Sequence, residues 1–153
     1  MKQGSVLKNE MMQLVGVELP PVVYEVEKGA IRKFAQAIGD SNPLWQDENY
    51  AQTSRYRGII APPTFVTALR HEGIIELLKT IKYPLKGLLN GSSEIECFQP
   101  IRPGDIITVS AKFTNFREHE GKAGKMLFMY YEVTYKNQKG KVVAIGRNMA
   151  IRR

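Results

Sequence analysis

The residues best suited to chemistry lie between Asp40 and Asp47, in a stretch that also holds Ser41, Asn42 and Trp45. A carboxylate such as Asp40 can orient water or accept a hydrogen bond, which is part of general acid–base chemistry. The indole of Trp45 donates a hydrogen bond but has no basic nitrogen near neutral pH, so it cannot take up a proton. No base partner for Ser41 is evident. Acid–base chemistry here would depend on Asp40, whose alternative role is to shape a turn.

Histidine, the side chain that most often moves protons near neutral pH, occurs only twice. His71 falls inside a predicted helix, and we interpret it as exposed or hydrogen-bonded within the fold. His119 lies in a charged stretch over residues 119–125 that predicts a solvated loop. We interpret Cys97, the single cysteine, as a half-buried strand residue rather than a nucleophile. The chain has no Gly-x-Ser-x-Gly, phosphate-loop or Gly-x-Gly-x-x-Gly motif and no cluster of metal-ligand types, so we expect no metal.

The segments that must position these residues are helical in the first half of the chain. Residues 22–26 predict a short strand, residues 29–38 a helix that ends at Gly39, and residues 48–52 a short helix capped by Asp47. The apolar residues of the first helix recur at the spacing of one helical face: Ile31, Phe34, Ala35 and Ile38.

A second, mostly apolar helix is expected to begin near Pro62 and Pro63, because proline is favoured in a first helical turn. It is predicted to extend to Leu78 and to be buried. Gly73 falls near its middle and weakens the case for one continuous helix.

From Leu88 onward the hydrophobic period becomes two, which is typical of strands. The alternation is clearest over residues 107–113, 127–135 and 142–151, and residues 137–140 predict a hairpin loop. Helices followed by long antiparallel strands indicate an α+β fold with the helix on one sheet face. A long buried helix wrapped by about five such strands is the hotdog fold.

Composition places limits on the class of protein. The 153 residues are 43% hydrophobic, which suits a single domain over residues 1–153. No apolar run reaches membrane-spanning length, and residues 1–10 lack the apolar stretch of a secretion signal. We therefore expect a cytoplasmic protein without membrane association.

The net charge of +7 is unevenly distributed. Residues 1–78 hold 8 Lys and Arg against 9 Asp and Glu, whereas residues 79–153 hold 14 against 6. A basic face in the second half would attract phosphates or an acidic carrier protein. Its simpler interpretation is a solvated surface, and the interleaved aromatics typical of nucleic-acid binding are missing, so we expect no nucleic-acid partner.

The loop motif resembles the signature of the MaoC-like hydratase/dehydratase family, whose members add water to, or remove it from, acyl thioesters. The matching residues are Asp40, Asn42, Pro43, Leu44 and Asp47. Trp45 stands where that family has its catalytic histidine. The resemblance implies a hotdog fold, an Asp–His pair that holds one water, and a backbone N–H that binds the thioester oxygen.

The helix start also departs from the family, which commonly has His-Gly there. Pro62 and Pro63 lack the N–H that the oxyanion would need, although Thr64 and Phe65 retain theirs. Loss of a positioned acid–base group costs roughly 10²–10⁴ in rate, and loss of one oxyanion donor roughly 10²–10³. A chain with both losses would be nearly inert by itself.

The wider resemblance is to the FAS1-like, N-terminal dehydratase branch, and it includes residues 99–105, in which residues 102–105 form a turn between strands. That branch implies a non-catalytic half that pairs with a catalytic MaoC-like half, as in mycobacterial-type (3R)-hydroxyacyl carrier-protein dehydratases. It implies a homodimer or heterodimer, a thioester of coenzyme A or an acyl carrier protein as substrate, and no separate cofactor. The substrate-binding residues that we expect are Asn42, Trp45, Pro62, Pro63, Thr64, Phe65 and Leu69.

Two alternatives stay open from the sequence. One is an active hydratase, dehydratase or thioesterase that uses Asp40 with a shifted oxyanion donor. The other is a non-enzymatic module that binds acyl-CoA or nucleic acid.

Overall fold

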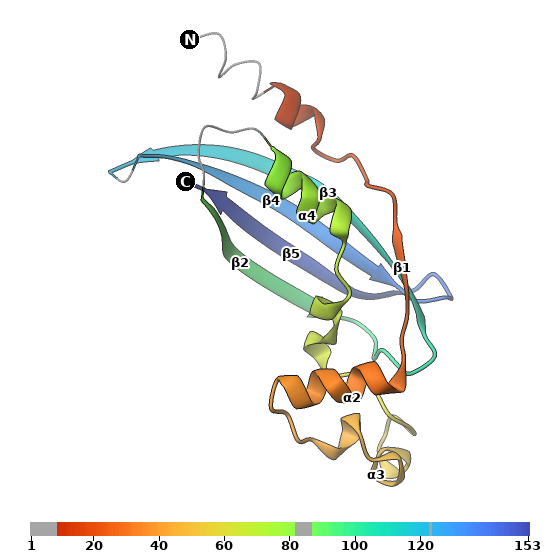
Figure 1. Ribbon diagram of the computed structural model, residues 1–153. Helices are drawn as coiled ribbons and strands as arrows, with labels where there is room; N and C mark the ends of the chain where they lie inside the picture. Colours follow the sequence, from red (N-terminus) through yellow and green to blue (C-terminus); the bar gives the residue numbers. More distant parts are fainter. Residues whose placement is uncertain (1–8, 82–86, 123) are drawn as a thin grey trace.

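A curved antiparallel sheet wraps around a helix in the computed structural model, which describes residues 9–81, 87–122 and 124–153 (Figure 1). The strands are β1 Val22–Glu25, β2 Leu88–Cys97, β3 Ile106–Gly121, β4 Gly124–Lys136 and β5 Val142–Arg152. The helices are α2 Lys28–Ala37, α3 Glu48–Thr53 and α4 Glu72–Thr80, with the 3₁₀ helices η1 Pro43–Trp45 and η2 Pro63–Ala68. The predicted α+β arrangement is confirmed.

The sheet has the order β1-β3-β4-β5-β2, with every pair antiparallel. Side chains that alternate along the strands face α4, as the period of two predicted. The buried ones on β3 are Ile107, Val109, Ala111 and Phe113. On β4 they are Leu127, Met129, Val133 and Tyr135. The two outer strands, β1 and β2, leave one edge each without a partner strand in the described residues.

The N-terminal segment lies along β3. Residues 9–13 are helical, and then Gly16 N–H donates to the carbonyl of Phe113 and Leu19 N–H to that of Ala111, both at 2.9 Å. Most of the polar leader, residues 1–8, lies outside the described residues. The predicted strand at residues 22–26 is confirmed as β1, shorter by one residue.

Helices α2 and α3 form a lobe at one end of the sheet (Figure 1). Ile31 and Ala35 of α2 are buried as predicted, but Ile38 is 49% exposed. The helix has ended at Ile38, and Gly39 adopts a positive φ of 68°, which turns the chain away. The predicted cap of α3 is confirmed, because Asp47 Oδ1 accepts a hydrogen bond from Tyr50 N–H at 3.0 Å.

The central helical region is in two pieces rather than one continuous helix. Its first piece is η2, and the chain then leaves helical geometry at Leu69 (ψ 75°) before α4 begins after His71 (ψ 95°). The break precedes Gly73, because the imidazole of His71 acts as the N-cap of α4 and so favours a new helix start. The buried apolar residues of the two pieces and the link between them are Phe65, Val66, Leu69, Ile74 and Leu78.

Residues 119–125 do not form the predicted long loop. The ladder of β3 and β4 continues through the pair His119 and Met126 to the pair Gly121 and Gly124. Gly124 has a φ of 98°, which suits the start of β4 at the end of this projecting hairpin. The predicted turn at residues 137–140 is confirmed, since Gly140 N–H donates to the carbonyl of Asn137 at 2.9 Å.

Candidate functional site

The loop between α2 and η1 is held by its own side chains. Asp40 Oδ1 accepts a hydrogen bond from Asn42 N–H, and Asn42 Oδ1 accepts one from Leu44 N–H, both at 3.0 Å. Asp40 N–H in turn closes α2 on the carbonyl of Ala35 at 2.9 Å. These short-range bonds are those of Asx turns, so Asp40 and Asn42 shape the loop. One oxygen of the half-buried Asp40 carboxylate remains open for another donor.

Trp45 ends η1 and is only 8% exposed, within the core that η1 shares with α2 and α3. Its Nε1–H is buried and has no hydrogen-bond partner among the described residues. An unpaired buried donor costs roughly 1–3 kcal/mol, so such groups are rare in folded proteins. The side chain that stands in the histidine position is therefore a buried donor with no acceptor in this chain's described part.

Neither histidine touches Asp40. His71 is buried, with Nε2 at 3.0 Å from the carbonyl oxygen of Pro20 and Nδ1 accepting from Ile74 N–H at 3.2 Å. The expectation of a hydrogen-bonded His71 is confirmed. His119 lies on β3, where its ring centroid is 6.4 Å from that of Phe128. Both imidazoles belong to other parts of the fold than the loop at residues 40–47.

The start of η2 has one backbone donor left. Phe65 N–H donates to the carbonyl of Pro62 at 2.9 Å, and Pro62 and Pro63 have no N–H. Thr64 N–H makes no hydrogen bond within the described residues. Phe65 is buried, with its ring edge-to-face on Phe34 at 5.5 Å between centroids. Of the expected oxyanion donors, Thr64 is thus the one whose N–H is still open.

Pro62 and Pro63 line a pocket of about 350 Å³ beside the end of β2. Its rim includes Tyr56, whose hydroxyl accepts a hydrogen bond from Arg55 Nη2 at 2.6 Å. Cys97 also borders it, and this residue is exposed at the end of β2 rather than half-buried as predicted. Burial of part of the thiol raises the pKa of Cys97 above its ordinary value, which is the opposite of what a reactive thiolate needs.

The comparisons with known proteins agree with this geometry. The sequence pattern of the family described as "FAS1-like, dehydratase domain region" matches residues 13–145. The chain belongs to this family. A UPF0336 protein of Streptomyces avermitilis is 33% identical over 110 residues, which are 70% of this chain and 73% of that protein.

Solved structures confirm the hotdog fold. A chain of the ChsH1-ChsH2 complex from Mycobacterium tuberculosis superposes with a TM-score of 0.81 at 20% identity, over 97% of this chain and 96% of that one. A chain of the truncated HadBC (3R-hydroxyacyl-ACP dehydratase) complex from the same organism gives 0.76 at 19%, over 90% and 96%. The MaoC-like dehydratase from Rhodospirillum rubrum gives 0.67 at 26%, over 91% and 93%. The resemblance to MaoC-like proteins is confirmed.

A second cavity of this FAS1-like dehydratase domain lies between α4 and the sheet, with a volume of about 180 Å³. Its helix side includes Ile74 and His71, and its sheet side includes Tyr131 and Asn148. Tyr131 falls in the alternating stretch over residues 127–135, and its sequence position alone did not assign it to a site. Its residue type could have indicated a site, because a tyrosine at a core-facing strand position carries a hydroxyl that needs a hydrogen-bond partner.

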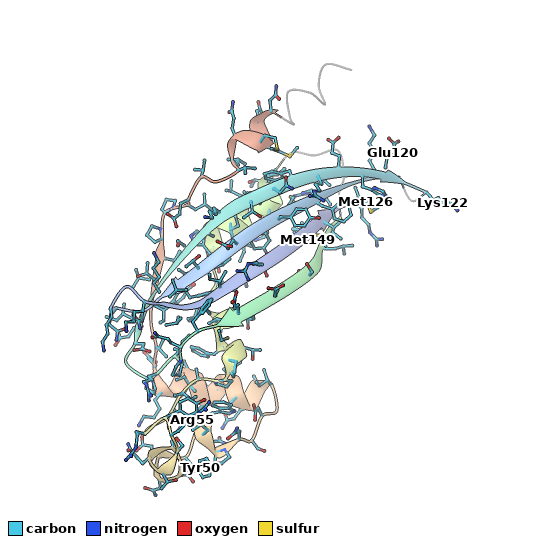
Figure 2. All side chains as sticks on the ribbon, turned by 180° about the vertical axis from the view of Figure 1, so that it is seen from behind. Tyr50, Arg55, Glu120, Lys122, Met126 and Met149 are labelled. Carbon is cyan, nitrogen blue, oxygen red and sulfur yellow. The ribbon has the colours of Figure 1, made fainter. Side chains whose placement is uncertain are left out.

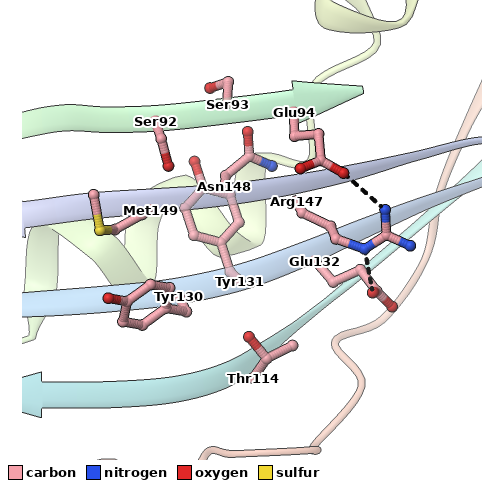
Figure 3. Close-up of a pocket in the computed structure, with 10 residues that line it drawn as sticks. All are labelled: Ser92, Ser93, Glu94, Thr114, Tyr130, Tyr131, Glu132, Arg147, Asn148 and Met149. Atoms are coloured by element: carbon pink, nitrogen blue, oxygen red, sulfur yellow. Dashed lines mark hydrogen bonds and ion pairs between the residues drawn. The ribbon is translucent and has the colours of Figure 1, made fainter. Parts of the chain in front are cut away.

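A groove of about 560 Å³ crosses β4, β5 and β2 on the other side of the sheet (Figure 3). Arg147 donates to Glu96 at 2.9 Å and to Glu94 at 3.2 Å, and its Nε lies 3.8 Å from Glu132. The hydrogen bond to Glu96 is the main cause that raises the pKa of the Arg147 guanidinium. Lys112 pairs with Glu132 at 3.9 Å, so the charges form a row across four strands.

The basic residues of the second half do not form the single face that their sequence position suggested. Lys122 and Lys125 lie at the β3–β4 turn, whereas Lys139 and Lys141 lie at the β4–β5 turn, at the other end of β4 (Figures 1 and 2). Arg152 is buried and donates to the carbonyl of Leu78, which ties β5 to the end of α4. The two pairs of lysines therefore lie at opposite ends of the sheet.

Among the described residues, no group of three His, Cys, Asp or Glu side chains is arranged to hold a metal ion. Within the same residues, no helix has the length and apolar character needed to cross a membrane.

Proposed function

We propose that this chain is a non-catalytic subunit of a (3R)-hydroxyacyl-thioester dehydratase or enoyl-thioester hydratase. It binds the acyl part of the substrate and pairs with a MaoC-like subunit that supplies the aspartate and histidine. The observation that carries this proposal is the buried indole of Trp45 at the histidine position of the motif. His71, whose two ring nitrogens are both engaged elsewhere, offers no replacement.

The open edge of β2 supports a paired state. All of its residues except Ile95 are exposed, including Leu88 and Leu89 at 40% and 41%. A ten-residue strand with a free edge readily adds another strand, and proteins usually cover such edges. The ChsH1-ChsH2 and HadBC structures, which share this fold, are complexes of two different subunits. Pairing with a second hotdog subunit, or with a copy of itself, would cover β2.

The proposed substrate is a thioester of coenzyme A or of an acyl carrier protein, both of which carry phosphate. Arg57 and Arg102 make no side-chain ion pair or hydrogen bond with any residue that the structure describes. Arg102 Nη1 lies 3.7 Å from the position of a Cβ on Gly58, the residue that follows Arg57. Arg102 also borders a pocket of about 290 Å³ near α3. Unpaired guanidinium groups of this kind suit phosphate recognition.

The decisive experiment measures hydration of an enoyl-CoA by the purified chain alone and in the presence of a purified MaoC-like protein that carries the motif aspartate and histidine. We expect no turnover above background for the chain alone and turnover for the complex. Asp40→Asn in this chain should leave the activity of the complex within about twofold, while the same change in the partner's motif aspartate should abolish it. Full activity of the isolated chain would reject the proposal.

A second candidate is an active enzyme that uses Asp40, and the open N–H of Thr64 favours it as the oxyanion donor. In that case the isolated chain would hydrate enoyl-CoA or hydrolyse acyl-CoA, and Asp40→Asn would reduce the rate by roughly 10²–10⁴. A non-enzymatic acyl-CoA-binding module is the third. It would bind acyl-CoA with the same affinity in the presence or absence of a partner and would stimulate no turnover.

A further inference from the structure

The cavity between α4 and the sheet has an unusual polar row on its sheet side. Tyr131 of β4, Asn148 of β5 and Ser93 of β2 are register neighbours, so they form one line across three strands. The next line along the cavity holds Val133 and Gly146, which are apolar. Polar side chains therefore interrupt an otherwise apolar wall at one level.

The strand alternation directs these side chains toward α4. Tyr131 makes an edge-to-face contact with the buried ring of Phe113 at 6.4 Å between centroids. Asn148 Nδ2 lies 3.4 Å from the position of a Cβ on Gly146, which borders the same cavity. Both residues also line the groove on the other side of the sheet (Figure 3).

Two members of this row, Tyr131 and Asn148, have hydrogen-bonding groups that are unused within the described part of the chain, whereas Ser93 Oγ accepts a hydrogen bond from Asn90 Nδ2 at 3.4 Å. The Tyr131 hydroxyl and the Asn148 amide are half-buried, and neither has a hydrogen-bond partner there. His71, on the opposite wall, differs because both of its nitrogens are engaged. Burial raises the pKa of Tyr131, so its hydroxyl stays a neutral donor at physiological pH. A donor, an amide donor and an amide acceptor thus face a space of about 180 Å³.

An alkyl chain in this space would cover these groups without pairing them. Each unmet hydrogen bond lowers affinity by roughly five- to tenfold, and a site built for hydrogen bonding discriminates strongly against a ligand that lacks the matching group. The volume corresponds to about six water molecules, so the group that enters is short.

We propose that this cavity takes the distal part of an acyl group that carries an oxygen function beyond the reacting carbons, held by Tyr131 and Asn148. The oxygen is a hydroxyl or carbonyl, so the preferred substrates are oxygenated short acyl thioesters rather than plain fatty acyl chains. This inference rests on the proposed acyl-binding function.

The test is calorimetric binding of matched thioesters to the purified complex, or to the chain alone if it forms a homodimer. The ligands are butanoyl-, hexanoyl- and octanoyl-CoA and their ω-hydroxy counterparts. We expect at least one ω-hydroxy thioester to bind about tenfold more tightly than its plain counterpart. Tyr131→Phe combined with Asn148→Leu should remove that preference, and Tyr131→Phe alone should reduce it. The control, Tyr130→Phe on the opposite sheet face, should keep it.

Equal binding of the plain and ω-hydroxy ligands by the unmodified protein would overturn the inference and leave the proposed function intact. A preference that survives in a folded Tyr131→Phe, Asn148→Leu variant would overturn the assignment of these two residues. Failure of every thioester to bind would instead reject the proposed function itself. Thermal melting shows whether each variant is folded. If the double variant is unfolded, the ligand preference of the single variant Tyr131→Phe decides whether the assignment holds.

Discussion

His71 Nδ1 accepts a hydrogen bond from Ile74 N–H at 3.2 Å, so an imidazole closes the first turn of α4. The other nitrogen, Nε2, is 3.0 Å from the carbonyl oxygen of Pro20 and fits the donor role in the neutral ring. One side chain thus satisfies an orphan N–H of the helix and fastens the N-terminal segment to it. A residue type that usually suggests catalysis here holds two segments together.

Replacement of His71 by alanine should lower the free energy of unfolding by about 2 kcal/mol, because the N-cap and the contact with Pro20 are both lost. Urea denaturation followed by circular dichroism measures this change. His71→Asn should lose less than half as much free energy of unfolding as His71→Ala, since asparagine is a good N-cap. Equal losses in the two variants would show that the cap is not the source of the stability.

Tyr135 should make the fold sensitive to alkaline pH. Burial, with the neighbouring Tyr131 and Tyr24 phenols, raises the pKa of Tyr135 from 10.0 to about 12. The folded state holds this proton more tightly than the unfolded chain, so its stabilising effect is complete below pH 10 and is lost as the pH rises toward 12. The loss is on the order of 2–3 kcal/mol. Urea midpoints across this range should fall for the unmodified chain and fall less for Tyr135→Phe. Parallel curves would contradict the assignment.

The strands and their faces were predictable from the sequence because burial on one sheet face imposes a period of two. Ile107, Val109 and Phe113 followed that pattern without exception. The break between η2 and α4 was not predictable, since it depends on a hydrogen bond between His71 and a residue 51 positions earlier. The extension of β3 and β4 into residues 119–125 was not predicted, because a charged, glycine-containing stretch is typical of a loop. Its pairing with a neighbouring strand cannot be recognised from the sequence alone.

The candidate site was only partly predictable. The loop at Asp40 and Asn42 was predictable from the motif, because each side chain accepts a hydrogen bond from the backbone N–H two residues later. The row formed by Tyr131, Asn148 and Ser93 joins three strands, and strand register cannot be read from spacing. The sequence left Thr64 and Phe65 as two possible oxyanion donors. Only the hydrogen bond from Phe65 N–H to the carbonyl of Pro62 leaves Thr64 as the open one.

The charge row around Arg147 should stabilise the sheet in a salt-dependent way. Arg147→Met leaves Glu94, Glu96 and Glu132 close together without their shared cation, and like charges on neighbouring strands repel. Thermal melting should show a lower midpoint in dilute buffer, with a smaller difference in concentrated sodium chloride because salt screens the charges. The control Lys79→Met, which breaks one isolated pair with Glu76, should change little in either buffer. A deficit that is independent of salt would point to lost packing instead.

The edge of β2 should be the one that another subunit covers. Edge strand β1 has only four residues, whereas β2 has ten and exposes Leu89. Leu89→Lys should weaken association by about tenfold or more, because a lysine on an edge strand opposes pairing. The matched change Val23→Lys, on the 61% exposed Val23 of β1, should leave association unchanged. Sedimentation velocity of the chain alone and with the MaoC-like protein that forms the active complex measures both. Weaker association only in Val23→Lys would place the contact on β1. Unchanged association in both variants would reject pairing through a strand edge.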